Sequence, residues 1–371
     1  MKIAIVHEYL CKIGGAERVL KTVSDFFPNA DIYCLVDNGY GKNLGIKNKI
    51  HSLTNFLPNF LLKKYQYLFF LYPHLIENLD LSDYDIVISL SNSFSHGVIT
   101  NEDTLHVSYY HSPMRFIWDY YHEYPKDLKM NKFFRIIWSY FSTKLRVWDF
   151  VASKRSDLKI CISNVVKKRI KKFYRSDAII INPPVNISEF SSGKDKGYFL
   201  IISRLSAYKN IDLAINAFNT NGKKLIIAGT GDQESYLKSI ARDNIEFKGR
   251  VCDSERVELL KHCRGFICLN EEDFGLTPIE AMASGKPVFA LKKGGYTETI
   301  RDDINGKFFT ELNIENFLQH FKDFETFIND KFDYKQSISD AKKFSEERFK
   351  EEFINQIKSA YFKKTGIEFD I

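Results

Sequence analysis

Short runs of apolar residues alternate with stretches of helical periodicity in both halves of the chain. Parallel strands need a crossover between them, usually a helix, so this alternation predicts an α/β protein with two doubly wound parallel sheets. The strands predicted in the first half are Ile3–Val6, Ile32–Val36, Tyr84–Leu90, His106–Tyr110, Lys159–Ile162 and Ala178–Ile181. Those predicted in the second half are Phe199–Ser203, Lys224–Ala228, Ile245–Lys248, Gly265–Leu269 and Pro287–Leu291.

The helices between these strands are predicted from apolar positions that share one face. The first helix carries Val19, Val23 and Phe26 on one face and ends before Pro28, because proline cannot continue a helix. Apolar positions from about Ser345 to Lys363 predict a last amphipathic helix that packs on a neighbouring element.

The prolines of the segment 182–186 predict a stiff, extended connector between two domains. A new series of strands and helices begins at Tyr198, so the boundary falls between 183 and 197. We therefore assign residues 1–190 to a first domain and residues 191–344 to a second.

Two aromatic, apolar stretches of the first domain, 56–75 and 133–150, are interrupted by basic residues. The first interpretation is that both are buried helices. The alternative is a membrane-surface face, because peripheral binding needs apolar insertion as well as attraction to anionic lipid. The interrupting residues are Lys63, Lys64, Arg135, Lys144 and Arg146.

Composition places the chain among ordinary soluble globular proteins. Its 371 residues are 44% apolar and 27% charged, which is enough for two domains and gives no case for disorder. The six cysteines form no Cys-x-x-Cys pair and no zinc-like spacing with histidine, so we expect reduced thiols in a cytoplasmic protein. The first apolar run, Ile3–Val6, is too short for a signal sequence, and no run of about 18 apolar residues predicts a membrane span.

Positive charge is concentrated in the first domain. Residues 1–190 hold 25 Lys and Arg against 18 Asp and Glu, a balance of +7, while the remainder hold 28 against 29. Basic residues are densest in the segment 154–175, where Asp157 is the only acidic residue. The basic residues of this segment are Lys154, Arg155, Lys159, Lys167, Lys168, Arg169, Lys171, Lys172 and Arg175. A solvated helix face explains this segment, and anionic lipid headgroups are the alternative; we expect no nucleic-acid partner.

Unusual residues fall repeatedly just after predicted strands. Open parallel sheets bind ligands beyond the carboxyl ends of their strands, so we expect one cleft to collect these residues. They are Gly14, Gly15, His111, Arg204, Gly229, Gly231 and Glu272.

Gly14 and Gly15 open the first helix, where bare backbone can bind a phosphate, although an ordinary βα turn explains them equally well. Their spacing does not match Gly-x-Gly-x-x-Gly, which disfavours a dinucleotide cofactor. Arg204 and Lys209 stand at a strand end and just before a helix, so both cations could hold one diphosphate without a metal. A surface pair is the alternative.

Glu272 and Glu280 flank a Phe-Gly turn at a strand end. Thr277 and Glu280 also form a capping-box sequence, with Pro278 at the first helical position, which gives Glu280 a purely structural explanation. Glu272 has no such explanation, and its carboxylate can accept hydrogen bonds from sugar hydroxyls.

His111 is either a satisfied structural histidine or a hydrogen-bond donor at a sugar-phosphate junction. The only Asp-x-Asp sequence, Asp83 to Asp85, precedes a strand and has no neighbouring histidine. We therefore expect no metal ion and no cofactor.

Taken together, the motifs resemble those of retaining GT-B glycosyltransferases of family four. The resemblance rests on Ser203-Arg204-Leu205, Lys209-Asn210, Ala228-Gly229-Thr230-Gly231, Gly249-Arg250-Val251 and Glu272-Asp273-Phe274-Gly275-Leu276 through Gly285. His7-Glu8-Tyr9, Gly14 to Glu17 and Tyr109 to Trp118 are similar to the branch that builds bacterial O-antigen and capsule glycans, with many mannosyltransferases. The chain departs from the commoner pattern at Asp273 and Asn186.

The resemblance implies two Rossmann-like domains that face a central cleft, with a C-terminal helix, about 345–371, crossing back onto the first. It implies that Arg204 and Lys209 hold the donor diphosphate, that Glu280 holds the ribose, and that Glu272 holds the sugar. The other implied donor contacts are Gly15, Gly229, Gly231, Arg250, Val251, Phe274, Gly275, Leu276 and Thr277. Gly14 and Arg115 would lie on the acceptor side, with His111 among the catalytic residues.

The activity implied is metal-independent transfer of a hexosyl unit, with mannose from GDP-mannose as the first candidate, to a lipid-linked or surface glycan in bacterial polysaccharide synthesis. The same resemblance implies a peripheral protein at the anionic inner face of the plasma membrane. Two alternatives remain open: a nucleotide-sugar epimerase of the same fold, and a non-catalytic nucleotide-sugar-binding protein.

Overall fold

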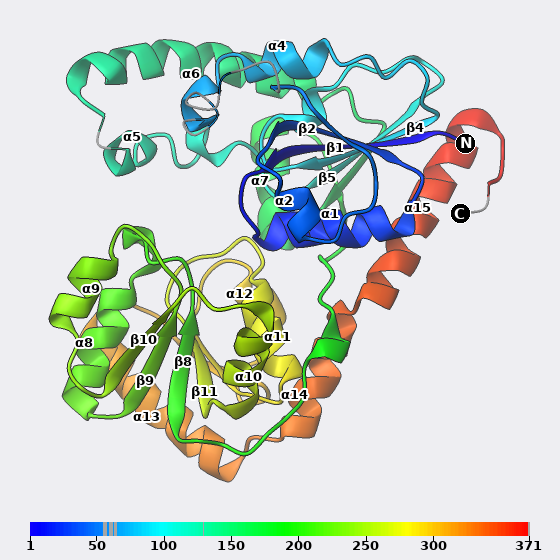
Figure 1. Ribbon diagram of the computed structural model, residues 1–371. Coiled ribbons are helices and arrows are strands. Elements are labelled where there is room, and N and C mark those ends of the chain that lie inside the picture. The colour runs from blue at the N-terminus through cyan, green and yellow to red at the C-terminus, as the bar shows by residue number, and fades with distance from the viewer. Residues whose placement is uncertain (55–57, 59–61, 63–64, 129, 370–371) are drawn as a thin grey trace. The chain divides into compact units, whose positions relative to one another are not determined.

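The computed structural model describes the chain except residues 55–57, 59–61, 63–64, 129 and 370–371. The chain divides into two compact units, residues 1–182 with 349–371, and residues 183–348 (Figure 1). The first unit therefore ends before residue 190, because the backbone N–H of Val185 bonds to the carbonyl of Phe344 and ties the connector to the second unit.

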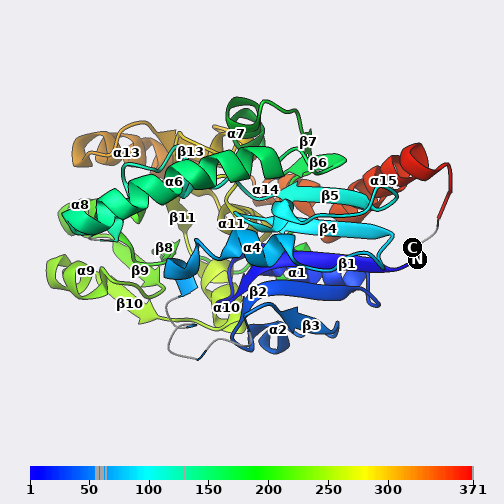
Figure 2. The same cartoon turned by 90° about the horizontal axis from the view of Figure 1, so that it is seen from above.

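The first unit holds a parallel sheet with the strand order β3-β2-β1-β4-β5-β6-β7, and β2, β1, β4 and β5 lie side by side in Figure 2. Its strands are β1 (Ile3–Leu10), β2 (Asp31–Asp37), β3 (Ile50–Ser52), β4 (Ile86–Ser91), β5 (Leu105–Tyr110), β6 (Leu158–Cys161) and β7 (Ile179–Ile180). The predicted α/β fold is confirmed. Only the short edge strand β3 was not predicted in this unit, because three residues carry no readable alternation.

The helices and 3₁₀ turns of the first unit connect these strands. They are α1 (Gly15–Phe26), α2 (Tyr40–Asn43), η1 (Tyr65–Leu68), α4 (Tyr72–Glu77), η2 (Ser95–Gly97), η3 (Arg115–Ile117), α5 (Tyr124–Asp127), α6 (Lys132–Ala152) and α7 (Asn164–Tyr174). The last helix, α15 (Glu346–Thr365), buries Phe349 and Phe353 against the ring of Tyr109. Its contacts explain why residues 349–371 belong to the first unit.

The second unit is a second parallel sheet, with the order β10-β9-β8-β11-β12-β13. Its strands are β8 (Tyr198–Ile202), β9 (Lys224–Ala228), β10 (Ile245–Gly249), β11 (Gly265–Cys268), β12 (Val288–Leu291) and β13 (Gly306–Phe309). Its helices and turns are η4 (Ile187–Glu189), η5 (Ala207–Lys209), α8 (Ile211–Asn221), α9 (Glu234–Ile240), α10 (Asp253–His262), α11 (Leu276–Ala283), α12 (Tyr296–Thr299), α13 (Ile314–Asp330), α14 (Tyr334–Ala341) and η6 (Lys342–Phe344). Strand β13 was not predicted.

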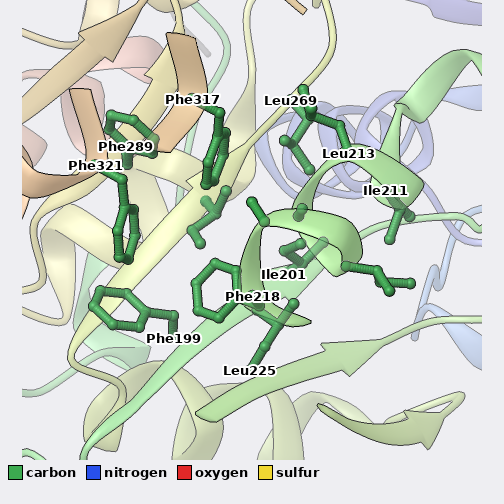
Figure 3. Close-up of a cluster of buried hydrophobic side chains, with 14 of the residues drawn as sticks. Phe199, Ile201, Ile211, Leu213, Phe218, Leu225, Leu269, Phe289, Phe317 and Phe321 are labelled. Atoms are coloured by element: carbon green, nitrogen blue, oxygen red, sulfur yellow. The ribbon is translucent and has the colours of Figure 1, made fainter. Parts of the chain in front are cut away.

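Phenylalanine rings fill the core of the second unit (Figure 3). Helix α13 places Phe317, Phe321 and Phe324 one turn apart on a single face, and these rings pack on Phe199 of β8 and Phe289 of β12. Burying each ring stabilises the fold by about 1.5–3 kcal/mol. This core holds the sheet that carries the candidate donor residues.

Helix α6 covers the stretch 133–150, and its outward face corrects the expectation of a buried helix. Phe133, Ile136 and Val147 are 66%, 71% and 64% exposed. Trp138 and Leu145 on the opposite face are buried in the core. The other stretch lies partly outside the described residues, which omit Phe56, Lys63 and Lys64.

The basic segment 154–175 is less uniform than its sequence indicates. Arg155 pairs with Glu77 at 2.5 Å, and Arg169, which is buried, pairs with Asp119 at 2.9 Å. Tertiary folding thus brings acidic partners that are distant in sequence. The positions that stay exposed are Lys154, Lys168, Lys171, Lys172 and Arg175.

Candidate functional site

Each sheet has one point at which the strand order reverses, between β1 and β4 in the first unit and between β8 and β11 in the second. Helices that leave the two strands of such a point go to opposite faces, so the carboxyl ends there form a natural binding crevice. Glu8 lies near one such end and Glu272 follows the other.

Lys209 and Glu272 come together at the switch point of the second unit. Lys209 Nζ forms an ion pair with Glu272 Oε1, and Asn270 Nδ2 donates a hydrogen bond to the same oxygen at 2.9 Å. The Lys209 side chain is 13% exposed, so Lys209 is not half of a surface pair. The guanidinium of Arg204 donates to the hydroxyl of Tyr208 at 2.7 Å.

Two glycines fix the turn that carries Arg204. A side-chain carbon on Gly229 would overlap the carbonyl oxygen of Ser203, and one on Gly231 would overlap that of Leu205. Gly229 also has a φ of +135°, which strongly favours glycine. The N–H of Leu205 completes this contact by donating to the carbonyl of Thr230 at 3.0 Å. These glycines therefore have a packing role in addition to the donor contact expected of them.

Gly275 begins the segment after Glu272 that was expected to hold the donor phosphates. Gly275 is the N-cap of α11 and has a φ of +89°, and no side chain caps this helix. The backbone N–H groups of the first turn, Leu276 and Thr277, are of the kind that binds anions. Gly294 and Gly295 were not predicted: their bare backbone packs on Glu272 and Phe274, and Gly295 N–H donates to the carbonyl of Glu272 at 2.8 Å.

Glu280 has a different environment from the expected capping box. Helix α11 begins at Leu276, so Thr277 lies inside the helix and cannot be the N-cap that the box requires. The Glu280 carboxylate is buried and forms an ion pair with Arg256 of α10. No local pattern pointed to Arg256, because the two residues meet only through the packing of α10 against α11.

Arg250 and Val251 follow β10 in a short turn. Gly249 before them has a φ of +64°, and Cys252 after them is the N-cap of α10. Arg250 is exposed and Val251 is half-buried.

Glu8 lies buried in a ring of hydrogen-bond donors in the first unit. Its buried carboxylate accepts from the backbone N–H groups of Asn92, Ser93, Phe94 and Ser95, each at 3.0 Å. Burial alone would raise the pKa of Glu8, but the neighbouring His7 and the backbone donors outweigh it and hold that pKa below its ordinary value. Glu8 therefore fixes the turn after β4.

His111 follows β5 and is also buried. The backbone N–H of His111 donates to the carbonyl of Ser91 at 2.8 Å. The ring nitrogen Nε2 of His111 has no hydrogen-bond partner among the described residues. Burial, followed by the neighbouring His7, lowers the pKa of His111 to about 3, although Glu8 opposes this shift. A neutral imidazole with one free nitrogen is suited to a hydrogen bond with a hydroxyl group.

Three further positions complete the first unit's candidates. Gly14 is the N-cap of α1 and Gly15 its first residue, as predicted, and the buried Glu17 already places a carboxylate beside Gly14. Arg115 pairs with Asp119 at 3.5 Å.

The Asp83 to Asp85 sequence lies before β4, at the opposite end of the sheet from His111. Asp85 accepts from the N–H of Lys2 at 2.7 Å, and the Lys2 ammonium pairs with Asp83 at 3.4 Å. Within the described residues, no group of three or more His, Cys, Asp or Glu side chains could hold a metal ion. In the same part of the chain, no helix is long and apolar enough to cross a membrane.

Family comparisons cover both units. A model described as "Glycosyltransferase Family 4" matches residues 13–189, and one described as "Glycosyl transferases group 1" matches residues 185–343. The protein belongs to this glycosyltransferase family.

Curated relatives match part of the chain. The O-antigen chain mannosyltransferase RfbU of Salmonella typhimurium is 30% identical over 148 residues, which are 36% of this chain and 42% of that protein. The alpha-1,3/1,6-mannosyltransferase ALG2 of Dictyostelium discoideum is 26% identical over 193 residues, 39% of this chain and 46% of that protein. An uncharacterized glycosyltransferase of Methanocaldococcus jannaschii is 27% identical over 170 residues, 44% and 48% of the two chains. The chain spans about half the length of these relatives.

Solved structures match nearly the whole chain. HepE of Anabaena, in complex with UDP and glucose, has a TM-score of 0.68 at 15% identity and covers 97% of this chain and 100% of its own. The lipopolysaccharide outer core galactosyltransferase WaaB has a TM-score of 0.64 at 18% identity, covering 97% and 99%. These similarities show a shared GT-B fold of two Rossmann-like domains.

Proposed function

We propose that the protein is a retaining, metal-independent hexosyltransferase that takes its donor from a nucleotide sugar, with mannose from GDP-mannose as the first candidate. The observation that carries the proposal is the Lys209–Glu272 pair at the switch point of the second unit. The ring of Tyr208, whose hydroxyl accepts from Arg204, has its centroid 5.1 Å from Lys209 Nζ. Support for a nucleotide-sugar donor comes from HepE, whose structures contain UDP and UDP-glucose. Support for mannose comes from the mannosyltransferases RfbU and ALG2.

The chemistry needs charge compensation rather than a strong acid. When the bond between the sugar C1 and the diphosphate breaks, its electrons go to a phosphate oxygen, and Arg204 with Lys209 stabilises that charge. The acceptor hydroxyl forms the new bond to C1 on the same face and gives its proton to the departing phosphate, which retains the anomeric configuration. A glycosidase, by contrast, must protonate its leaving alkoxide with a carboxylic acid.

The remaining residues take the roles that the resemblance implies. Glu272 binds hydroxyls of the transferred sugar, Glu280 binds the ribose, and the Arg250–Val251 backbone contacts the base. The backbone of Phe274 to Thr277 and the turn at Gly229 and Gly231 bind the donor phosphates. In the first unit, Gly15 contacts the donor and Gly14 and Arg115 serve the acceptor side. His111 is a catalytic residue, with its free Nε2 offered to a hydroxyl.

The acceptor in this proposal is a lipid-linked or surface glycan of bacterial polysaccharide or O-antigen synthesis, reached by docking of the protein on the inner face of the membrane. Helix α6 supports docking because Phe133, Ile136, Tyr140 and Val147 recur at helical spacing on its exposed face. The only acidic residue of α6, Asp149, is buried.

Exposed basic residues lie on α6 itself and on α7 of the same unit. Lys132, Arg135 and Lys144 on α6 are exposed, and α7 adds Lys168, Lys171 and Lys172. Apolar insertion combined with cations and no exposed acid on α6 fits an anionic bilayer better than a solvated helix face.

The reaction is tested by incubating the protein with GDP-, UDP-, ADP- and dTDP-sugars, with and without a lipid-linked glycan. Nucleotide release that depends on the acceptor, with an α-configured product from an α-configured donor, supports the proposal. Epimerised free sugar would instead indicate an epimerase, and binding without turnover a non-catalytic protein. Turnover should persist in EDTA; complete loss that magnesium or manganese restores would contradict the metal-independent mechanism.

The two glutamates are separated by matched variants. Glu280→Gln should weaken binding of free nucleoside diphosphate and of nucleotide sugar by a similar factor, about tenfold. Glu272→Gln should leave nucleoside diphosphate affinity unchanged while lowering turnover and sugar discrimination. Calorimetry in which both variants bind free nucleotide like the wild type would remove Glu280 from the site.

Membrane docking is tested by sedimentation with vesicles of phosphatidylcholine alone and with phosphatidylglycerol. Replacing Phe133, Ile136 and Tyr140 by Ser should abolish binding to anionic vesicles, and salt should weaken binding of the wild type. The control replaces three exposed rings or aliphatic groups of the second unit, Tyr236, Leu312 and Tyr334, by Ser. Equal binding to neutral and anionic vesicles, or an equal loss in both triple variants, would contradict the proposal.

A further inference from the structure

Arg256 is a buried arginine that the expected donor site does not use. Its side chain is 8% exposed and lies on α10, and its Nη1 faces Oε1 of Glu280 on α11. The guanidinium also stands over the ring of Phe190, 5.3 Å from its centroid. The whole arrangement lies within residues 183–348.

Two further carboxylates surround the same guanidinium. Oε2 of Glu189 lies 3.7 Å from Nη2 of Arg256, and Oδ1 of Asp253 lies 3.4 Å from its Nε. Glu189 and Phe190 lie just after the connector of residues 182–186, near the start of the second unit. The side-chain amide of Asn186 donates a 2.9 Å hydrogen bond to the carboxylate of Glu189. Arg256 thus joins the connector to Glu280.

A buried ion pair of this kind is a poor device for stability. Removing a guanidinium and a carboxylate from water carries a large desolvation cost, and apolar residues of similar volume often stabilise a fold equally well or better. The arrangement makes more physical sense where one partner must present a fixed, charged oxygen to a ligand. Glu280 has two carboxylate oxygens, and the ion pair with Arg256 is made through one of them, Oε1.

We propose that Arg256 is a positioning residue for nucleotide recognition: it holds Oε1 of Glu280 so that Oε2 is presented to the ribose hydroxyls. Phe190 and Glu189 keep the guanidinium in place from the connector side. The inference rests on the proposed role of Glu280 and adds a residue that never touches the nucleotide. A carboxylate without this partner can rotate about its side-chain bonds and loses the fixed geometry that two adjacent hydroxyls need.

The test compares affinities for a ribonucleoside diphosphate and its 2′,3′-dideoxy form, using GDP, UDP or ADP, whichever the wild type binds most tightly. Arg256→Met should weaken binding of the ribonucleotide about tenfold and leave the dideoxy form unchanged. Arg256→Lys should recover part of the loss. The double variant Arg256→Met with Glu280→Gln should be no weaker than Glu280→Gln alone, because both changes remove the same contact.

A purely structural role would lower both affinities equally or neither, and either result would overturn the inference. Glu189→Gln provides a variant that keeps the buried ion pair, so it should fold even if Arg256→Met does not; it should weaken only the ribonucleotide, by about two- to threefold, and no change would count against the role of the connector. If Glu280→Gln itself does not alter the preference for ribose, the assignment of Glu280 fails. If Glu280→Gln alters it and Arg256→Met does not, only the role of Arg256 fails.

Discussion

Glu8 and Glu272 occupy comparable places in the two units, each beside the switch point of a parallel sheet, but their partners differ in kind. Glu8 is bound by four backbone N–H groups that cannot move without unfolding the turn after β4. Glu272 is bound by the side chains of Lys209 and Asn270. The first carboxylate is therefore part of the fold, whereas the second belongs to a charged group that a ligand can share.

Tryptophan fluorescence makes this comparison measurable. All three tryptophans, Trp118, Trp138 and Trp148, lie in the first unit, so their signal reports unfolding of that unit. Turnover of the nucleotide sugar reports on the charges of the second unit.

Glu8→Ala should have the largest effect, on stability. It leaves four backbone N–H groups without their acceptor, three of them buried and that of Asn92 part-buried. At roughly 1 kcal/mol for each, the first unit loses about 4 kcal/mol. The melting temperature followed by tryptophan fluorescence should fall by about 10 °C. Glu8→Gln keeps one acceptor oxygen and should lose less. A shift under about 2 °C for Glu8→Ala would mean that the cradle of N–H groups is not what holds the turn.

Lys209→Met should lower turnover strongly and leave the stability of the first unit unchanged. Removing a cation that stabilises the departing phosphate should lower turnover by about 10²–10³-fold. The tryptophan melting temperature should stay within about 1 °C, since Lys209 lies in the other unit. Lys224→Met is the matched control, because Lys224 forms a surface ion pair with Glu246 at 3.6 Å in the same unit. Turnover within threefold of the wild type would return Lys209 to a structural role.

Acid should destabilise the first unit in two steps. The pKa of His111 is lowered to about 3, below its ordinary 6.5, so its neutral form contributes stability that is present above pH 6.5 and is lost as pH falls toward 3. The pKa of Glu8 is also lowered, so its contribution is lost only below about pH 4.3. His111→Gln should reduce the slope of stability between pH 6 and pH 5 by about 1.4 kcal/mol per pH unit.

The control for this slope is His122→Gln, because His122 is exposed in the same unit. Urea unfolding at several pH values, followed by tryptophan fluorescence, measures both variants. An unchanged slope in His111→Gln would show that His111 is protonated in the folded protein at these pH values.

Tyr208→Phe should have the smallest effect. It removes the hydroxyl that accepts from Arg204 at 2.7 Å, a contact at the protein surface where Tyr208 is 43% exposed. Losing one such bond is worth about 1 kcal/mol, so KM for the nucleotide sugar should rise about fivefold with kcat unchanged. A fall in kcat without a change in KM would place Tyr208 among the groups that contact the transition state.

Much of the fold could be predicted because it follows from local pattern. Each predicted strand overlaps a strand of the structure, and α1 ends at Phe26, before Pro28, as its sequence indicates. The candidates of the second unit were found because glycines and charges directly follow strands. The capping box predicted at Thr277 was wrong, because the helix begins earlier than this local motif indicates. Gly275 is the N-cap of α11, so Thr277 already lies within the helix.

The sequence by itself determined the two sheets, the candidate residues at their carboxyl ends and the family, since periodicity and motif order are properties of neighbours along the chain. Tertiary structure alone decided which charges meet: Arg256 with Glu280, Lys209 with Glu272, and Glu8 with the turn after β4. It also decided that the apolar face of α6 is exposed. These outcomes depend on residues far apart in sequence that packing brings within hydrogen-bond distance, and no local pattern encodes such distances.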